Sequence, residues 1–207
     1  MEETTQYLTY EARIRQSPDY ALRELSGHFD HHNAVWHTLR NVVRDLEAAG
    51  IPYMLVGALA LNQHGYERAT TDVDLIMTSE GLAHFRDTDT QVKIEVIIAG
   101  GFPGDGKPKP VSFPDPSEAV VLKNVRVVPF VKLIELKLAS GLSAAHRLKD
   151  LADVQEMVHA LNLPLDLGTQ LEASVRGEYE RLWHTVNDTH DDAHDPHDEL
   201  RQSRRQT

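Results

Sequence analysis

The sequence predicts an α/β (α+β) protein, in which a mixed sheet with flanking helices is followed by a small C-terminal helical bundle. An apolar run at residues 53–56 has the length of a buried strand, and residues 91–98 alternate before becoming apolar, as a strand entering a core does. After Pro129, apolar residues recur at helical spacing to about residue 184. A chain of 207 residues with 41% apolar content can bury such a core.

Composition excludes several classes of protein. The chain has no cysteine, so neither a disulfide framework nor a thiolate metal site is possible. No apolar run approaches the length of a membrane span, and the N-terminal residues lack the apolar region of a signal peptide, so we expect a cytoplasmic protein with no membrane partner. The net charge of −11 argues against a broadly basic surface for nucleic acid but is compatible with a local basic patch.

Residues 1–28 are polar and weakly periodic, which predicts an N-terminal arm with at most a short helix around residues 10–15. A helix is expected from Phe29, with Asp30 as a possible N-cap and Gly50 as its end. It should pack on the sheet through apolar residues at helical spacing: Val35, Leu39, Val42, Val43 and Leu46. The histidines near its start are interpreted as solvated, because the sequence supplies no convergent metal ligands beside them: His31, His32 and His37.

The centre of the chain is predicted to be a strand, a turn, a short helix and a second strand. Residues 53–56 form the first strand, and Gly57 lets the chain turn at no steric cost. Good helix formers follow at residues 58–63, and the first backbone N–H groups of that helix are free to bind an anion. A polar turn at residues 64–71 then leads into Asp72-Val73-Asp74, where strand alternation places both carboxylates on one face.

Two carboxylates held side by side repel and raise each other's pKa, so such a pair usually needs a positive group between them. Mg²⁺ is the obvious candidate, because it prefers carboxylate oxygens and is commonly held by one or two carboxylates together with substrate phosphates. The whole pattern therefore predicts a site for a nucleoside triphosphate with its metal. An Asp-x-Asp pair alone is also common on solvent-facing strands.

These residues resemble the nucleotidyltransferase superfamily of the DNA polymerase β type, and most closely the bacterial AbiEii-type and minimal nucleotidyltransferases of toxin–antitoxin systems. The family motif is a hydrophobic strand, Gly-Gly or Gly-Ser, a short helix and Asp-x-Asp on the next strand. Here it reads Val56-Gly57-Ala58 and Asp72-Val73-Asp74, and a looser likeness extends over residues 51–158.

The resemblance implies a nucleotidyltransferase-like fold in which Asp72 and Asp74 are catalytic metal ligands. Gly57 and Ala58 would bind the nucleotide's phosphates through backbone N–H groups. Ala58 departs from the motif, because it has no hydroxyl to offer a phosphate.

The family also has a third carboxylate on a strand beside Asp-x-Asp, and Glu95 is the only acidic residue here in a matching strand context. The resemblance implies that Glu95 completes the metal site and helps to deprotonate the acceptor. Alternatively, Glu95 faces solvent and pairs with Lys93 or another cation. The segment from Leu75 to Ile94 has only twenty residues, fewer than the family usually has, so the orientation of Glu95 stays open.

The middle of the chain carries weaker signals. Ser79 is a candidate cap for a helix that reaches about Arg86. Residues 100–116 are too rich in glycine and proline for a helix or central strand and should form a loop. Its lysines, Lys107 and Lys109, could reach substrate phosphates but are interpreted as solvated. Residues 120–128 predict a short hairpin that closes the sheet.

The helical half begins after Pro129, with Gly141 as the predicted stop of its first helix and residues 144–161 as the second helix. Another amphipathic helix is predicted over residues 168–184 through Leu171, Val175, Tyr179 and Leu182. We therefore expect four segments: an arm at 1–28, a nucleotidyltransferase-like core at 29–128, a helical subdomain at 129–184, and a disordered acidic and His-rich tail at 185–207.

Residues 137–154 resemble the family's downstream motif, a helix lysine followed by Lys-Asp and a further Asp. The resemblance implies that Lys137 faces the triphosphate as a catalytic and nucleotide-binding residue. It also implies that Lys149, Asp150 and Asp153 match the second-helix motif, with Lys149 and Asp150 binding the nucleotide. An ion pair between Arg147 and Asp150 is an equal alternative. Arg68, in the turn before Asp72, is a further candidate for nucleotide binding.

The predicted function is Mg²⁺-dependent transfer of a nucleoside monophosphate from a triphosphate to an acceptor hydroxyl. The resemblance makes a tRNA end or a protein side chain the expected acceptor, and a cognate toxin or antitoxin an expected partner. Retained activity stays open, because Ala58 and the short segment before Glu95 also fit a non-catalytic nucleotide-binding or antitoxin-like module. An acidic protein that binds a basic partner is the remaining alternative.

Overall fold

A mixed sheet lies at the centre of the protein. The computed structural model describes residues 8–78 and 85–188, and within them the sheet has six strands in the order β3-β4-β2-β1-β6-β5. The strands are β1 (Tyr53–Val56), β2 (Asp72–Met77), β3 (Phe85–Arg86), β4 (Lys93–Ile98), β5 (Val120–Leu122) and β6 (Val125–Val127). The predicted fold class, a mixed sheet with flanking helices and a helical bundle after it, is confirmed.

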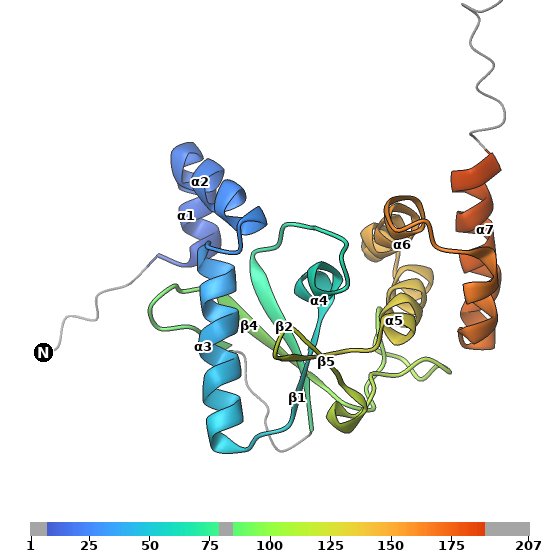
Figure 1. Ribbon diagram of the computed structural model, residues 1–207, viewed down its shortest axis with the longest axis horizontal. Coiled ribbons are helices and arrows are strands. Elements are labelled where there is room, and N and C mark those ends of the chain that lie inside the picture. The colour runs from blue at the N-terminus through green and yellow to red at the C-terminus, as the bar shows by residue number, and fades with distance from the viewer. Residues whose placement is uncertain (1–7, 79–84, 189–207) are drawn as a thin grey trace, which may run out of the picture.

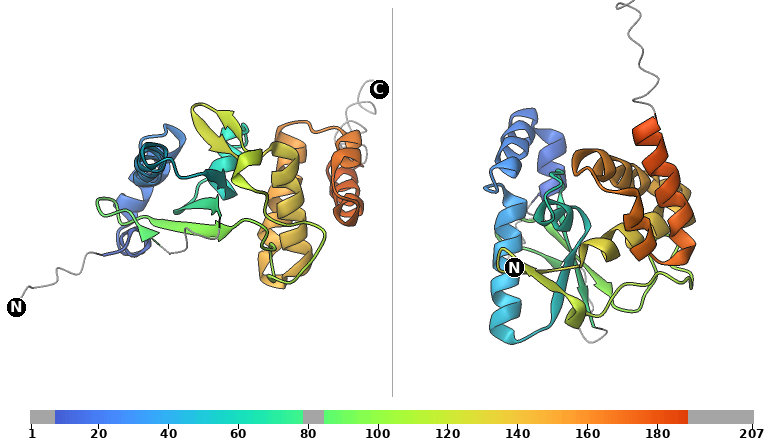
Figure 2. Two further views of the ribbon diagram at one scale, coloured as in Figure 1. Left: turned by 90° about the horizontal axis from the view of Figure 1, so that it is seen from below. Right: turned by 45° about the vertical axis from the view of Figure 1, so that its right-hand side comes forward.

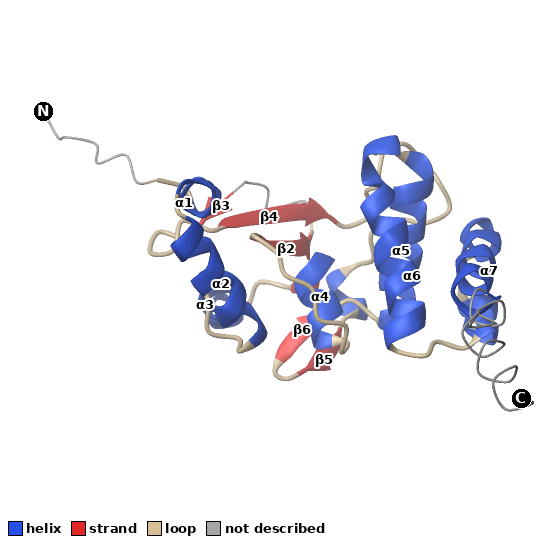
Figure 3. Cartoon of the chain, turned by 90° about the horizontal axis from the view of Figure 1, so that it is seen from above, coloured by secondary structure: helices blue, strands red, loops and turns tan. Residues whose placement is uncertain are grey.

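Helices lie on both sides of this sheet (Figure 1). The N-terminal group is α1 (Tyr10–Gln16), α2 (Pro18–Phe29) and α3 (Ala34–Ala49). The C-terminal group is α5 (Phe130–Ser143), α6 (Leu148–Ala160) and α7 (Ala173–Asp188), with α5 and α6 side by side (Figure 2). Helix α4 (Gly57–Gln63) lies between the two groups (Figure 3). Short 3-10 helices cover Pro116–Glu118, Ala145–Arg147 and Leu165–Gln170.

The pairing of β2 with its two neighbours sets up the site. β2 runs antiparallel to β1 and parallel to β4, with Asp72 opposite Lys93 and Asp74 opposite Glu95. Every residue of β1 is buried, because this strand lies in the middle of the sheet and packs on both faces. The hairpin β5–β6 forms as predicted, with Lys123 and Asn124 at positive φ in its two-residue turn.

The N-terminal region differs from the predicted arm. Ser17 caps α2 by accepting from the Tyr20 backbone N–H, so a second helix follows α1 directly. Tyr10 is only 2% exposed and joins the core. Helix α3 is capped by Asn33 rather than by Asp30, which is the C-cap of α2, whereas Gly50 ends α3 in the left-handed region as predicted. Tyr10 and Ile14 of α1 pack into or against the core, which the weak periodicity of residues 1–28 did not predict.

Three later expectations need correction or lie outside the described residues. The predicted helix from Ser79 falls mostly on residues 79–84, which are outside the described range, and Arg86 is in a strand. Gly141 does not stop its helix, since α5 continues to Ser143. Helix α7 runs to Asp188, so the first four positions assigned to the tail are helical, and residues 189–207 lie outside the described range.

Candidate active site

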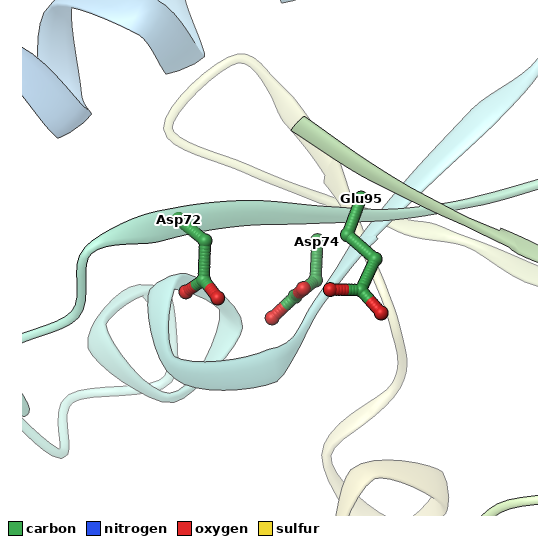
Figure 4. Close-up of side chains that lie close together, drawn as sticks. All are labelled: Asp72, Asp74 and Glu95. Carbon is green, nitrogen blue, oxygen red and sulfur yellow. The ribbon is translucent and has the colours of Figure 1, made fainter. Parts of the chain in front are cut away.

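Three carboxylates converge from two adjacent strands. Asp74 and Glu95 are register partners on the parallel strands β2 and β4, and Asp72 precedes Asp74 on the same face. One oxygen from each of the three lies within 4.8 Å of the others, and Figure 4 shows all three side chains pointing to the same side of the sheet. The predicted arrangement of these groups is therefore confirmed, and the twenty-residue connection does not turn Glu95 away.

Gly57 lies against the carboxylate of Asp74 and leaves room for it. Its φ is +71°, and a Cβ added there would overlap the Asp74 carboxylate. No side chain caps the start of α4, because the N-cap residue is Val56 and it makes no side-chain hydrogen bond to the helix. Glycine therefore serves two needs at this point: a backbone conformation that other residues adopt at a cost, and room for Asp74.

Asp74 is held in an unfavourable electrostatic environment. Burial raises its pKa to about 7, and the neighbouring charges of Asp72 and Glu95 add to the effect, while Lys137 and Lys93 oppose it. The other two carboxylates have close partners. Thr70 Oγ1 donates to Asp72 Oδ1 at 2.5 Å, and Lys93 Nζ donates to Glu95 Oε2 at 2.6 Å. Glu95 thus belongs to the group of three carboxylates and also forms the ion pair with Lys93 that the sequence offered as the alternative.

The opposite wall carries cations in a buried network. Lys137 on α5 is 6% exposed, and its Nζ donates to Asp150 Oδ1 at 3.1 Å and to Asp153 Oδ2 at 2.6 Å on α6. Ser140 Oγ donates to Asp150 Oδ2 at 2.7 Å, and Arg68 Nε lies 3.1 Å from Asp153 Oδ1. Burial works to raise the pKa of Asp150, but the charge of Lys137 and the hydrogen bond from Ser140 hold that pKa below its usual value.

The two walls enclose a cleft of about 170 Å³. All residues assigned to the site from the sequence line it: Gly57, Ala58, Arg68, Asp72, Asp74, Glu95, Lys137, Lys149 and Asp150. Arg147 lines it too, and its Nε lies 3.9 Å from Asp150 Oδ2, so the predicted alternative of an ion pair is a loose contact. The structure brings these residues together, while their chemical roles stay predictions.

Other lining residues were not singled out from the sequence. Apolar and polar groups from four segments complete the cleft: Thr70, Ile97, Pro103, Gly104, Phe113, Leu133, Leu136 and Ser140. Only strand alternation could have found Ile97, which follows Glu95 on the same face. Lys107 and Lys109 do not line the cleft; Lys109 Nζ bonds Pro103 O, Asp105 and Ser143, and Lys107 is largely exposed.

The three carboxylates fit a magnesium ion. They offer hard oxygen donors on one face, and like-charge repulsion raises the pKa of Asp74, which is the condition that a bound cation would relieve. No donor of another chemistry is needed, since Mg²⁺ usually keeps waters and takes substrate phosphate oxygens as further ligands.

No helix among the described residues combines the length and apolar character needed to cross a membrane.

Two solved structures show a distant likeness to this chain. No family model and no curated protein matches the chain. JHP933 from Helicobacter pylori is 16% identical with a TM-score of 0.43, over 73% of this chain and 89% of that one. A candidate nucleotidyltransferase from H. pylori is 16% identical with a TM-score of 0.44, over 79% of this chain and 96% of that one. Both TM-scores lie below 0.5, so neither likeness identifies a family for this protein.

Proposed function

We propose that this protein is an Mg²⁺-dependent nucleotidyltransferase, which moves a nucleoside monophosphate from a triphosphate to an acceptor hydroxyl. The observation that carries the proposal is the group of three carboxylates on one face of β2 and β4, facing cations across a single cleft. A triphosphate with its metal carries charges that suit both walls, since the metal would bind the carboxylates and the phosphates would face the cations. The resemblance of the Gly57 and Asp-x-Asp segment to polymerase β-type nucleotidyltransferases supports the same reaction.

Asp72, Asp74 and Glu95 would hold the metal, which would lower the proton affinity of the acceptor hydroxyl and neutralise charge on the phosphate oxygens. The hydroxyl oxygen attacks the α-phosphorus, and the bond from that phosphorus to its bridging oxygen breaks, so pyrophosphate leaves with the electron pair. Glu95, whose side chain is 37% exposed, takes the hydroxyl proton. Lys137 and Arg68 would stabilise the charge that develops on the phosphates, and Gly57 and Ala58 would add backbone N–H groups.

A non-catalytic nucleotide-binding module is the second candidate. Two observations favour it: Ala58 offers no hydroxyl at the start of α4, and Lys93 already engages Glu95 at 2.6 Å. Such a module would bind the triphosphate and its metal without turnover. For either function, we propose a tRNA end or a protein hydroxyl as the acceptor or contact, and a toxin–antitoxin pair as the setting.

Calorimetry with ATP or GTP, with Mg²⁺ and then with chelator, tests the proposed function. We expect binding that depends on Mg²⁺ and that Asp74→Asn abolishes, because this substitution removes a hard anionic ligand without changing the volume of the side chain. Asp166→Asn is the matched control, since Asp166 is exposed and does not line the cleft. Triphosphate affinity that is indifferent to chelator and to Asp74→Asn would contradict metal-mediated binding.

Turnover separates the enzyme from the binder. Triphosphate labelled at the α-phosphorus should transfer label to an acceptor tRNA or protein, with release of unlabelled pyrophosphate. Label transfer that Asp74→Asn removes supports the enzyme. Tight Mg²⁺-dependent binding with no transfer to either class of acceptor would favour the non-catalytic module.

A further inference from the structure

A histidine outside the cleft contacts the segment that carries one of its cations. His28 lies near the end of α2 and is 2% exposed. Its Nε2 lies 3.0 Å from the backbone oxygen of Arg68, forty residues along the chain, and its Nδ1 lies 3.3 Å from Asn33 Nδ2. The side chain of Asn62 on α4 closes the group, with Nδ2 3.0 Å from His28 Nε2.

The hydrogen bonds select one form of the ring. With the proton on Nε2, the ring donates to Arg68 O and accepts at Nδ1 from the Asn33 amide, while the nearby Asn62 amide donates to Arg68 O and not to the ring. With the proton on Nδ1, Nε2 would accept from Asn62 Nδ2, but Nε2 and the Arg68 oxygen would be two facing acceptors and Nδ1 would face another donor, so the first form satisfies two of the three ring contacts and the second only one. Burial also lowers the pKa of His28, although the bond to Arg68 opposes this, so the neutral ring is favoured.

Both backbone polar groups of Arg68, the N–H and the carbonyl, are hydrogen-bonded to side chains. Its N–H donates to Asn62 Oδ1 at 2.6 Å, and its carbonyl accepts from His28 and from Asn62 Nδ2, the latter at 3.1 Å. The side chain then crosses to α6, where Nε lies 3.1 Å from Asp153 Oδ1, and it lines the cleft. The backbone of Arg68 is thus anchored by two residues that do not line the cleft, His28 and Asn62, while Arg68 itself lines it.

We propose that His28 is a positioning residue for Arg68, acting from the N-terminal helices on a cation that would contact the nucleotide's phosphates. The consequence for binding rests on the proposed function. The ring also lies beside Trp36 on α3, with ring centroids 6.0 Å apart, but the hydrogen bond from Trp36 Nε1 to the backbone oxygen of His28 at 2.9 Å and the cap of α3 by Asn33 do not use the ring. Of the two ring nitrogens, Nδ1 contacts Asn33 at the start of α3 and Nε2 is directed at Arg68. A guanidinium recognises phosphate by direction as well as charge, so its anchoring matters for affinity.

A double-mutant cycle tests the proposal on the full chain. His28→Leu, Arg68→Gln and the double variant are compared for the Kd of Mg²⁺-ATP and of adenosine. We expect His28→Leu to weaken Mg²⁺-ATP by roughly tenfold, the scale seen when a group that orients a ligand-binding side chain is removed, and to leave adenosine unchanged. In the Arg68→Gln background, His28→Leu should have no further effect. His28→Gln should recover most of the affinity, because its amide can donate to the same carbonyl.

Two results would overturn the proposal: losses that add independently in the double variant, or an equal loss for adenosine and Mg²⁺-ATP. Tyr179→Phe is the matched control, since it removes one hydrogen bond from a buried side chain to a backbone carbonyl, Pro164 O at 2.9 Å, and neither residue lines the cleft. It should change neither affinity.

Hydrogen exchange separates failure of this proposal from failure of the proposed function. If the wild-type protein does not bind Mg²⁺-ATP, the proposed function fails, and the Arg68 amide then decides the positioning role. Exchange of that amide should be about tenfold faster in His28→Leu, relative to the amide of Leu75 in the central sheet, and unchanged in Tyr179→Phe. Unaltered protection of the Arg68 amide in His28→Leu would show that the ring does not position this segment.

Discussion

At the scale of single residues, the charge of Asp74 destabilises the folded protein at the position where the candidate site is formed. Burial, and then the charges of Asp72 and Glu95, raise its pKa to about 7 from an unfolded value of 3.8. The unfolded chain therefore loses this proton near pH 4, whereas the folded chain retains it to about pH 7. The contribution of this group to stability is present at acid pH and is lost as pH rises from about 4 to 7.

Asp74→Asn should therefore stabilise the metal-free protein at pH 8 and have much less effect at pH 5, where the native carboxyl is largely protonated. We expect its melting temperature at pH 8 to rise by a few degrees, since one kcal/mol corresponds to about 2–4 °C in a protein of this size. Thermal unfolding in chelator at both pH values measures the difference. If the variant is less stable than the wild type at pH 8, the charge of Asp74 does not destabilise the folded protein.

At the scale of elements, a close approach between α5 and α6 fixes the wall that carries Lys137. A Cβ on Gly141 would lie 2.5 Å from Leu151 Cγ and 3.2 Å from the Leu151 backbone nitrogen, so the two helices touch at this glycine. Gly141 therefore serves helix packing rather than the helix stop that its type suggests, and α5 continues past it. The contact keeps Lys137 on α5 within reach of Asp150 and Asp153 on α6.

Gly141→Ala and Gly177→Ala should have opposite effects on stability. Both glycines lie inside helices, but only Gly141 has neighbours that an added methyl group would strike, because nothing lies within 4 Å of a Cβ on Gly177. Gly141→Ala should destabilise by roughly 1–3 kcal/mol through overpacking. Gly177→Ala should stabilise by roughly 0.5–1 kcal/mol through helix propensity. Urea unfolding of the two variants measures both values, and a stabilising Gly141→Ala would refute the close contact.

At the scale of the whole molecule, buried charges join the sheet to the C-terminal helices. Arg68, from the connection before β2, and Lys137, from α5, both engage Asp153 on α6. Asp150 and Asp153 are 7% and 6% exposed, so each needs the cation it faces. The resemblance implied only a role in catalysis and nucleotide binding for Lys137, and the buried network gives this residue a structural role as well.

Lys137→Met should lower the free energy of unfolding by roughly 3–5 kcal/mol, because it leaves two buried carboxylates without their shared cation. Lys107→Met is the matched control, with the same change of side chain at a position that is 80% exposed, and it should shift stability by less than about 1 kcal/mol. Chemical denaturation without nucleotide gives both values. Near-equal effects would mean that the Lys137 network contributes no more than a surface ion pair.

The sequence by itself determined the local course of the chain. The strand at residues 53–56, the turn at Gly57, the strand with Asp72 and Asp74, the end of α3 at Gly50 and the hairpin at residues 120–127 all follow as predicted. Each depends on signals within a few residues, such as strand alternation, helical period and the freedom of glycine at positive φ. The placement of Asp72 and Asp74 on one face belongs to the same class, since it needs only the period of a strand.

Tertiary structure alone decided the features that join distant segments. The face presented by Glu95 depends on its register with Asp74 across β2 and β4, which strand alternation cannot supply. The partners of Lys137, the contact at Gly141 and the bond from His28 to Arg68 each connect separate elements. Periodicity in the sequence predicts which residues lie on a common face of one helix or strand. The free energies of buried charges and close contacts depend on which faces pack together, and the packing of the whole chain decides that.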